Sequence, residues 1–388
     1  MTDTNSDNDF AQRVLTWFDA HGRHDLPWQQ HHKDDSDIYA VWLSEIMLQQ
    51  TQVTTVMDYF IRFMAQFDSV EKLAAADWES VASLWAGLGY YARARNLHAG
   101  AKQVVEFIAT HGHFPQTVDD WQNIKGVGRS TAGAIVAMGV RGFGVICDGN
   151  VKRVLTRHAG IKGDITKSAT DKELWELATR LTPQSNSGRY AQAMMDMGAT
   201  LCTRTRPKCD ICPIAADCTA YQAGNPTAYP VKSKKGDKPS RHSVVLILSY
   251  DDKLLWLKRQ RTTGGSIWHG FWCLPLLNSE QEISPSLHQA HLAELLNKDD
   301  DTAQLVEQEI YPILAKLDKP NFHALPTFKH TLTHFHWHLT PLIISLDKGQ
   351  FEQITQVLAD CKQDYLWQDR QALNLAIPKA MDKVLDLI

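Results

Sequence analysis

One stretch organises this chain: Cys202-Thr-Arg-Thr-Arg-Pro-Lys-Cys209-Asp-Ile-Cys212-Pro-Ile-Ala-Ala-Asp-Cys218. Its four cysteines follow the spacing C-x6-C-x2-C-x5-C. Thiolates this close in sequence can bind one iron–sulfur cluster or one zinc ion. Zinc sites commonly pair their ligands as two C-x2-C arms, and this spacing differs, so the pattern favours a cluster. A third interpretation is four structural thiols that bind nothing.

The loop between the first two cysteines is basic, because it carries Arg204, Arg206 and Lys208. Such side chains supply the sequence-independent part of DNA affinity by neutralising backbone phosphates. We therefore expect this loop to contact DNA. The net charge of −4 at pH 7 is a weak argument against a nucleic-acid partner, since local charge rather than the total steers binding.

The whole chain has 388 residues, enough for two domains with separate cores. Its hydrophobic content of 44% and charged content of 22% are typical of soluble proteins. No apolar run approaches the roughly 20 residues that span a bilayer, so we expect no membrane association. Residues 1–9 are acidic and polar, which predicts a disordered N-terminus and no signal peptide. Seven cysteines in such a chain favour reduced thiols and a cytoplasmic location.

Residues 10–221 are expected to form an all-α domain. Apolar residues recur there with helical spacing, and no long alternating run occurs. The helical patterns lie at Val53–Phe67, Trp78–Gly87, Ala92–His111, Arg129–Val140, Val151–Ala159, Asp171–Leu181 and Tyr190–Leu201.

Residues 222–240 have a different composition, rich in glycine, proline and lysine, which predicts a linker. Beyond it, the β-branched run Ser243–Tyr250 and the turn signal at Asp251 predict a strand and a hairpin partner at Leu254–Lys258. Alternating apolar and histidine residues around Phe335 predict another strand. Residues 241–388 therefore form an α+β domain. We interpret the histidines as a polar strand face rather than a metal site.

Glu45 shares one helix face with Ile38, Trp42 and Gln49. The simplest interpretation is a surface charge at a helix edge. If that face is buried, desolvation raises the carboxyl pKa from about 4.3 toward neutrality, and the protonated group can act as a general acid.

Two further segments carry candidate groups. The turn Gly126-Val-Gly128-Arg129-Ser130 exposes backbone N–H groups at a helix N-terminus, where a phosphate can bind, although a plain connection fits equally well. Asp148 and Asn150 lie where a loop enters a helix, so an N-cap is the alternative to a functional role.

Five motifs together resemble the MutY-type adenine DNA glycosylases of the helix-hairpin-helix superfamily. They are Leu43-Ser-Glu45-Ile-Met-Leu-Gln-Gln50-Thr-Gln-Val, Gly87-Leu-Gly-Tyr90-Tyr-Ala-Arg-Ala-Arg95-Asn, Gly126-Val-Gly-Arg-Ser130-Thr-Ala, Asp148-Gly-Asn150-Val-Lys-Arg and the cysteine spacing. The match is dense over residues 10–220. It is thinner beyond, through Gly270-Phe-Trp-Cys-Leu-Pro and Phe328-Lys-His-Thr-Leu-Thr-His334-Phe.

The resemblance implies a base-excision repair enzyme that flips out adenine mispaired with 8-oxoguanine or guanine and leaves an abasic site. It assigns Glu45 as the acid that protonates a ring nitrogen of adenine. Asp148 would stabilise the cationic sugar, through a transient covalent adduct, in the manner of paired carboxylates at a glycosidic bond. Asn150 would orient Asp148 or the water.

The resemblance also implies how DNA and a cofactor are held. The four cysteines would bind one structural 4Fe–4S cluster. Gln50 and Tyr90 match residues that wedge into the duplex. The remaining DNA contacts would come from the hairpin, from Lys152 and from the basic loop, that is, from Gly126, Gly128, Arg129, Ser130, Lys152, Arg204, Arg206 and Lys208.

Strand cleavage is expected to be weak or absent. Relatives that cut DNA carry an attacking lysine where this chain has Ser130. Lys152 is close in sequence and leaves room for residual lyase activity by trapping an opened sugar.

The C-terminal domain resembles a MutT/Nudix-like module. The catalytic Nudix pattern needs an Arg-Glu pair, which this chain lacks throughout, so the module is expected to bind rather than hydrolyse. Family members read 8-oxoguanine with a Phe-Ser-His loop. The matching residues here are Leu332, Thr333 and His334, so lesion recognition is assigned to Thr333 and His334.

Two other functions fit part of the sequence. One is an endonuclease III-like glycosylase/lyase acting on oxidised pyrimidines, which Ser130 and the C-terminal domain oppose. The other is a non-enzymatic iron–sulfur DNA-binding protein, which Glu45 and Asp148 oppose. The partner is expected to be mispaired double-stranded DNA bound by a monomer on the bacterial nucleoid, with the linker as the place for any repair-protein partner.

Overall fold

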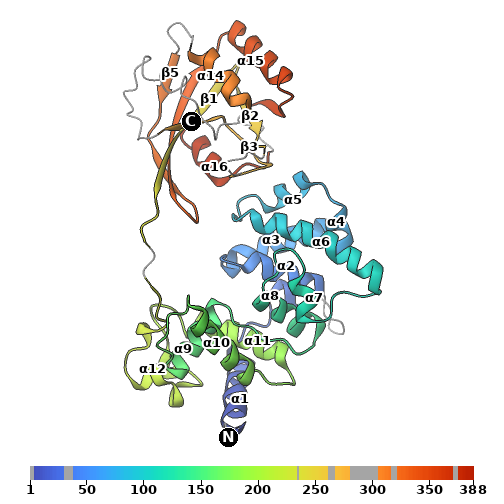
Figure 1. Cartoon of the computed structure of the whole chain (residues 1–388), viewed down its shortest axis with the longest axis vertical. Helices are drawn as coiled ribbons and strands as arrows, with labels where there is room; N and C mark the ends of the chain where they lie inside the picture. The colour runs from blue at the N-terminus through green and yellow to red at the C-terminus, as the bar shows by residue number, and fades with distance from the viewer. Residues whose placement is uncertain are drawn as a thin grey trace. The chain divides into compact units, whose positions relative to one another are not determined.

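A computed structural model describes residues 4–29, 38–233, 236–260, 267–279, 305–315, 321–369 and 375–388. The chain divides into two compact units, Met1–Lys235 and Gly236–Ile388 (Figure 1). A helical first unit and a sheet-containing second unit confirm the predicted order of an all-α and an α+β domain. Within the described residues, no helix combines the length and apolar character needed to cross a bilayer.

The first unit consists of helices joined by short turns. The α-helices are α1 Thr4–His21, α2 Ile38–Leu48, α3 Val53–Gln66, α4 Val70–Ala75, α5 Trp78–Trp85, α6 Ala92–His111, α7 Val118–Gln122, α8 Arg129–Ala134, α9 Gly149–Ala159, α10 Ser168–Leu181, α11 Ser187–Asp196 and α12 Thr219–Gln222. Single π-helical turns, η2 Ile135–Val140 and η3 Met197–Leu201, continue α8 and α11. Short 3-10 turns are η1 Pro27–Gln29, η4 Cys209–Ile211, η5 Ala215–Asp217 and η6 Pro226–Ala228.

These helices bury two separate apolar clusters. One cluster is shared by helices α2 through α8 and is centred on Trp42, Trp85 and Trp121, each 0% exposed. The other joins α1, α9, α10 and α11 around Phe10 and Leu155. Figure 1 shows the two groups of helices as two lobes of the first unit. Helices α2 and α8 from the first lobe and α9 from the second therefore face a common boundary, where the candidate residues lie.

Helices α4 and α7 are among the short helices that lie outside the sequence-predicted set. α4 and α7 have six and five residues, too few for an apolar period to stand out. Each is fixed by its cap instead: Ser69 accepts a hydrogen bond from the Lys72 N–H, and Thr117 forms a capping box with Asp120.

The N-terminus differs from the expectation of disorder over residues 1–9. Residues 1–3 lie outside the described part, but residues 4–9 belong to helix α1. Two ion pairs hold this end of the helix: Asp7 with Arg180 of α10, and Asp9 with Arg13 one turn later. A polar segment is thus ordered by charges that only the folded chain brings near it.

The expected linker, residues 222–240, also differs from a uniform tether, apart from residues 234–235, which are not described. Its first half contacts the helical unit, since Tyr229 is buried and the carboxylate of Asp164 accepts hydrogen bonds from Ser233. Its last residues belong to the second unit, where the Lys238 ammonium donates to the Leu332 carbonyl at 2.8 Å.

The second unit is built on a mixed eight-stranded sheet with the path β3-β2-β1-β7-β5. β1 pairs parallel with β7 along its length, whereas β1–β2 and β6–β7 are antiparallel. The strands are β1 Ser240–Tyr250, β2 Lys253–Lys258, β3 Trp272–Cys273, β4 Leu276–Ser279, β5 Asn321–Ala324, β6 Phe328–Thr331, β7 His336–Ser345 and β8 Tyr365–Asp369. Helices α14 Leu305–Ala315 and α15 Lys348–Asp360 share one core with this sheet, and α16 Lys379–Leu385 closes the chain.

Candidate functional site

Glu45 lies in the last half of helix α2, between the fully buried Leu43 and Met47. Its side chain is half-buried, and this burial, with the nearby charge of Asp148, raises its pKa to about 8. The helix explains the effect in part, because mid-helix N–H groups bond to carbonyls one turn back and are not free to stabilise a carboxylate. Glu45 therefore holds a proton at neutral pH and does not behave as a surface charge.

Asp148 is the N-cap of helix α9. Its Oδ1 accepts hydrogen bonds from the backbone N–H groups of Asn150 at 3.1 Å and Val151 at 2.8 Å. Burial raises the pKa of Asp148, while these hydrogen bonds, and then Arg153 and Lys152, act in the opposite direction. Because both capping bonds end on Oδ1, they leave Oδ2 for another partner. The capping interpretation is thus compatible with a functional one.

Asn150 is tied to the cysteine loop by Arg153. The Arg153 guanidinium donates to the Asn150 side-chain oxygen at 2.9 Å and, through Nε, to the Cys202 carbonyl at 2.8 Å. It also donates to the Gly198 carbonyl. One arginine thus fixes the orientation of the Asn150 amide and links it to the loop that carries the cysteines.

The four cysteines line one small cavity together with Arg157. Arg157 is 2% exposed and donates to the Cys202 thiol at 3.2 Å. Over the part of the chain that is described, no three His, Cys, Asp or Glu side chains are arranged to hold a single metal ion. The four cysteines nevertheless gather at one place, since they share the lining of this cavity with Arg157.

The basic loop borders this cavity, which Pro207 and Lys208 help to line. Arg204, Arg206 and Lys208 are all exposed. The loop backbone is held from within, since the Arg157 guanidinium donates to the carbonyls of Thr203 and Arg204. The backbone is therefore pinned while its cationic side chains face solvent.

Gln50 and Tyr90 occupy two turns with left-handed backbone, at φ 60° and 51°. Both are exposed, and Tyr90 keeps 51% of its surface accessible although it is a large aromatic residue. The Arg93 guanidinium donates to one backbone carbonyl in each turn, that of Gln49 and that of Gly89. An exposed aromatic ring on a constrained turn is suited to inserting between bases.

The hairpin turn precedes helix α8. Gly126 has φ 83°, and a Cβ there would meet the Asn96 side chain at 2.6 Å, so the position requires glycine. Gly128 caps the helix without a side chain, and Ser130 accepts a hydrogen bond from the Cys147 N–H at 3.0 Å. This last bond joins the hairpin directly to the segment that carries Asp148.

The two cations beside the hairpin have intramolecular partners. The Arg129 guanidinium lies 3.9 Å from the ring centroid of Trp175, and Lys152 forms an ion pair with Asp171. Arg129 remains exposed. The ion pair of Lys152 limits its availability as an amine nucleophile.

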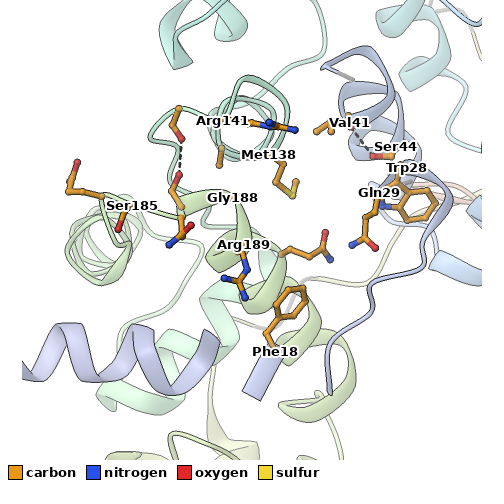
Figure 2. A pocket seen from close by; sticks show the side chains of 16 residues that line it. Phe18, Trp28, Gln29, Val41, Ser44, Met138, Arg141, Ser185, Gly188 and Arg189 are labelled. Carbon is orange, nitrogen blue, oxygen red and sulfur yellow. Dashed lines mark hydrogen bonds between the residues drawn. The ribbon is translucent and has the colours of Figure 1, made fainter. Parts of the chain in front are cut away.

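A cavity of about 560 Å³ lies between α1, α2, η2 and α11 (Figure 2). Ser44 on α2, directly before Glu45, and Trp28 line it, although Glu45 and Asp148 do not. Gln192 on α11 also lines it, and its Nε2 donates to the buried Asp196 at 2.9 Å. That bond leaves the Gln192 oxygen as an acceptor.

Thr333 and His334 are exposed at the tip of the β6–β7 hairpin. The base of the turn is rigid. The Leu332 N–H donates to the Phe335 carbonyl, and Phe335 packs edge-on against Trp337, with Arg241 4.3 Å over its ring. The exposed tip is thus held next to the packed rings of Phe335 and Trp337.

Sequence reasoning did not single out Arg93, Arg153, Arg157, Trp28 or Gln192 as site residues. An arginine's partners depend on packing across long sequence separations. The helical spacing of Arg153 and Arg157 from Asn150 could have placed them on one face of α9.

Comparisons with known proteins found relatives of both units. Two family models match: "HhH-GPD superfamily base excision DNA repair protein" over residues 43–180 and "NUDIX domain" over residues 243–387. The chain is 32% identical over 379 residues to the adenine DNA glycosylase of Buchnera aphidicola subsp. Schizaphis graminum, covering 97% of this chain and 98% of the relative. The Homo sapiens adenine DNA glycosylase is 44% identical over 218 residues, covering 55% and 39%. A solved thermostable thymine-DNA glycosylase aligns with TM-score 0.50 and 25% identity, covering 56% of this chain and 98% of that one.

Proposed function

The chain belongs to the adenine DNA glycosylase family, so it removes adenine from DNA in base excision repair, and we propose that Glu45 and Asp148 perform the excision. The observation that carries this proposal is the pKa of Glu45, raised to about 8 beside Asp148. A carboxyl group that keeps its proton at neutral pH beside a second carboxylate is the arrangement that glycosidic bond cleavage uses.

The first step breaks the bond between adenine and C1′ of its sugar. Glu45 gives its proton to a ring nitrogen, so the bonding electrons leave with a neutral base. The sugar becomes cationic, and Oδ2 of Asp148, which the capping bonds leave unused, forms a transient ester with C1′.

The second step restores the protein. A water oxygen attacks C1′ and displaces Asp148, while Glu45, now a carboxylate, takes the water's proton. The products are free adenine and an abasic site. Asn150, oriented by Arg153, holds the water or Asp148 in line for this attack.

The cavity that is lined by Ser44, the residue before Glu45, receives the flipped base. Its 560 Å³ accommodates a purine, and Trp28 offers an aromatic face. The Gln192 oxygen, left as an acceptor by Asp196, suits the exocyclic amino group of adenine and repels the carbonyl oxygen at the same place in guanine. This preference is a reason for the cavity to select adenine.

DNA is gripped by several exposed groups. Gln50 and Tyr90 enter the duplex, and the N–H groups at Gly126 and Gly128 bind a backbone phosphate. Further phosphate contacts come from Arg129, Ser130, Lys152, Arg204, Arg206 and Lys208.

Cys202, Cys209, Cys212 and Cys218 would hold one 4Fe–4S cluster, which would supply a structural link for the basic loop and take no part in base removal. Arg157 supports this assignment, because a buried guanidinium beside Cys202 offsets the negative charge of the thiolates.

The enzyme acts as a glycosylase without efficient strand cleavage. Ser130 stands where a lyase has its attacking lysine, and its hydroxyl is engaged by the Cys147 N–H. Lys152, the other amine nearby, is paired with Asp171.

The second unit recognises the base opposite adenine. Thr333 and His334 project from a supported hairpin tip and provide a hydroxyl and an imidazole for the modified guanine edge of 8-oxoguanine. The protein works as a monomer on nucleoid DNA in the cytoplasm, and its linker is the place for any repair-protein partner.

A single-turnover excision assay tests this function. Duplexes carry adenine opposite 8-oxoguanine, guanine or cytosine, and a further duplex carries an oxidised pyrimidine. We expect release of adenine from the first two, slow release from the third, and an intact product strand until alkali is added. Nicking of the pyrimidine duplex instead would support an endonuclease III-like lyase. Binding without any excision would support a non-enzymatic protein.

A further inference from the structure

Arg93 is an unusually connected buried cation. It is 9% exposed, and its Nη1 donates to the carbonyls of Ile46 at 3.1 Å, Met47 at 2.8 Å and Gln49. These carbonyls belong to the end of helix α2, where the last turn leaves acceptors without intrahelical partners. Arg93 therefore caps the helix that carries Glu45.

The same guanidinium also binds the turns on both sides of that helix end. Nη2 donates to the Thr51 hydroxyl at 3.0 Å, next to Gln50, and to the Gly89 carbonyl at 3.3 Å, next to Tyr90. The guanidinium carbon lies 5.2 Å from the centroid of the Tyr90 ring and 5.7 Å from that of Trp85. One side chain thus joins two exposed turns that are 40 residues apart in sequence.

Both turns need such support. Gln50 and Tyr90 have left-handed backbone that residues with a Cβ rarely adopt, and an arrangement of this kind persists only when its surroundings hold it. In the described part of the chain, no backbone–backbone hydrogen bond joins the two turns directly, and Arg93 supplies their common partner.

We propose that Arg93 is a positioning residue that fixes Gln50 and Tyr90 as one rigid wedge, so that both enter the duplex together when adenine is flipped. The proposal rests on the proposed function, in which these two residues open the DNA. Lysine cannot replace arginine here, because an ammonium lacks the planar fork that reaches several carbonyls while stacking on aromatic rings.

The test compares Arg93→Lys with Arg95→Lys. Arg95 lies in the same helix and stacks on a different ring, with its guanidinium 4.9 Å from the Trp78 ring centroid, so its replacement controls for loss of a stacked arginine. Each variant is assayed for single-turnover excision on a paired duplex with adenine opposite 8-oxoguanine. The second substrate is the same duplex with mismatched flanking pairs, so that it is already open.

We expect Arg93→Lys to lose about 10- to 100-fold on the paired duplex, as misplaced groups do, and less than about threefold on the open one. Arg95→Lys should change neither rate by more than about threefold. An equal loss on both substrates would mean a general structural defect and would overturn the proposal, and so would no loss on the paired duplex.

A double-variant cycle keeps the proposal testable if Arg93→Lys is less stable. Combining Arg93→Lys with Tyr90→Ala should cost little more than Tyr90→Ala alone, since both act through the same wedge. Fully additive losses would contradict the proposal. Excision by the parent protein establishes the proposed function independently, so failure of this inference is distinguishable from failure of the function.

Discussion

The middle of helix α2 and the start of helix α9 each present one carboxyl group to the candidate active site, in opposite backbone surroundings. Glu45 sits where helical hydrogen bonds already use the N–H groups, and its pKa rises to about 8. Asp148 sits where a helix begins, and two free N–H groups bond to its Oδ1. Both groups are partly buried, so burial alone does not distinguish them.

The difference shows how the position of a residue along a helix decides which backbone groups can reach a buried carboxyl group. A helix interior offers a buried carboxyl no backbone donor, so it keeps its proton. A helix N-terminus offers several donors and a favourable dipole, so the carboxylate form is stabilised there. The same fold therefore gives the two carboxyl groups different backbone partners, although burial raises the pKa of both.

The largest expected effect comes from removing the acid. Glu45→Gln keeps the size of the side chain and abolishes proton donation, so single-turnover excision should fall by on the order of 10²–10⁴ or more. Binding to the mispaired duplex should survive, as a mobility-shift titration would check. Glu106→Gln, an exposed carboxyl on α6, is the control. Excision by Glu45→Gln close to the parent rate would rule out the acid role.

Two substitutions of Asp148 should distinguish its role in excision from its role as the N-cap of helix α9. Asp148→Asn retains an N-cap acceptor but not the charge, so we expect an excision loss on the order of 10²–10³ with little loss of stability. Asp148→Ala should lose a similar activity and also about 1 kcal/mol of unfolding free energy. Thermal unfolding of both variants measures the second effect. Equal stability of the two variants would show that the cap is unimportant.

The pH dependence of excision sharpens the comparison. Glu45 must be protonated to act, so the rate under conditions of limiting enzyme should fall about tenfold per pH unit above its pKa of about 8. In Asp148→Asn the loss of the neighbouring charge should move this break to lower pH, measured on the residual activity. If the pH at which the rate begins to fall is the same in Asp148→Asn as in the parent, burial alone raises the pKa of Glu45.

The last prediction concerns stability rather than activity. The folded protein binds a proton at Glu45 up to pH about 8, against an ordinary value of 4.5, so the stability present below pH 4.5 is lost as the pH rises toward 8. Glu45→Gln removes this dependence and should be more stable at pH 8.5 by a few kcal/mol, but not at low pH. Urea unfolding at pH 6 and pH 8.5 measures the change. Parallel curves for parent and variant would contradict the raised pKa.

Local patterns predicted much of the helical unit. Helix α6 spans the residues that its apolar period indicated, and the family resemblance drawn from five motifs is confirmed by full-length relatives. The candidate pair Glu45 and Asp148 also came from motif positions. The roles of these residues stay predictions until they are tested by excision assays.

Other features depend on contacts between distant residues, which a single sequence does not display. Helix α1 begins before residue 10 because Arg180 reaches Asp7. The parallel pairing of β1 with β7 joins strands that are nearly 100 residues apart, and alternation in one strand does not name its neighbour. Arg93 was visible only as one basic residue among many, since its role arises from carbonyls more than 40 residues earlier.

The anchoring of the linker at Ser233 and Lys238 has a consequence for affinity. Ser233 is bound to Asp164 of the helical unit and Lys238 to the Leu332 carbonyl of the sheet unit, so the chain between these anchors makes only five residue steps. Five steps reach at most about 18 Å. In the proposed function, this short chain gives the hairpin tip a millimolar-range effective concentration near DNA held by the helical unit, so weak contacts at the tip would add to the avidity of the whole chain. Inserting a flexible segment after Ser233 would lower the effective concentration of the hairpin tip and reduce avidity, although every contact residue would be unchanged.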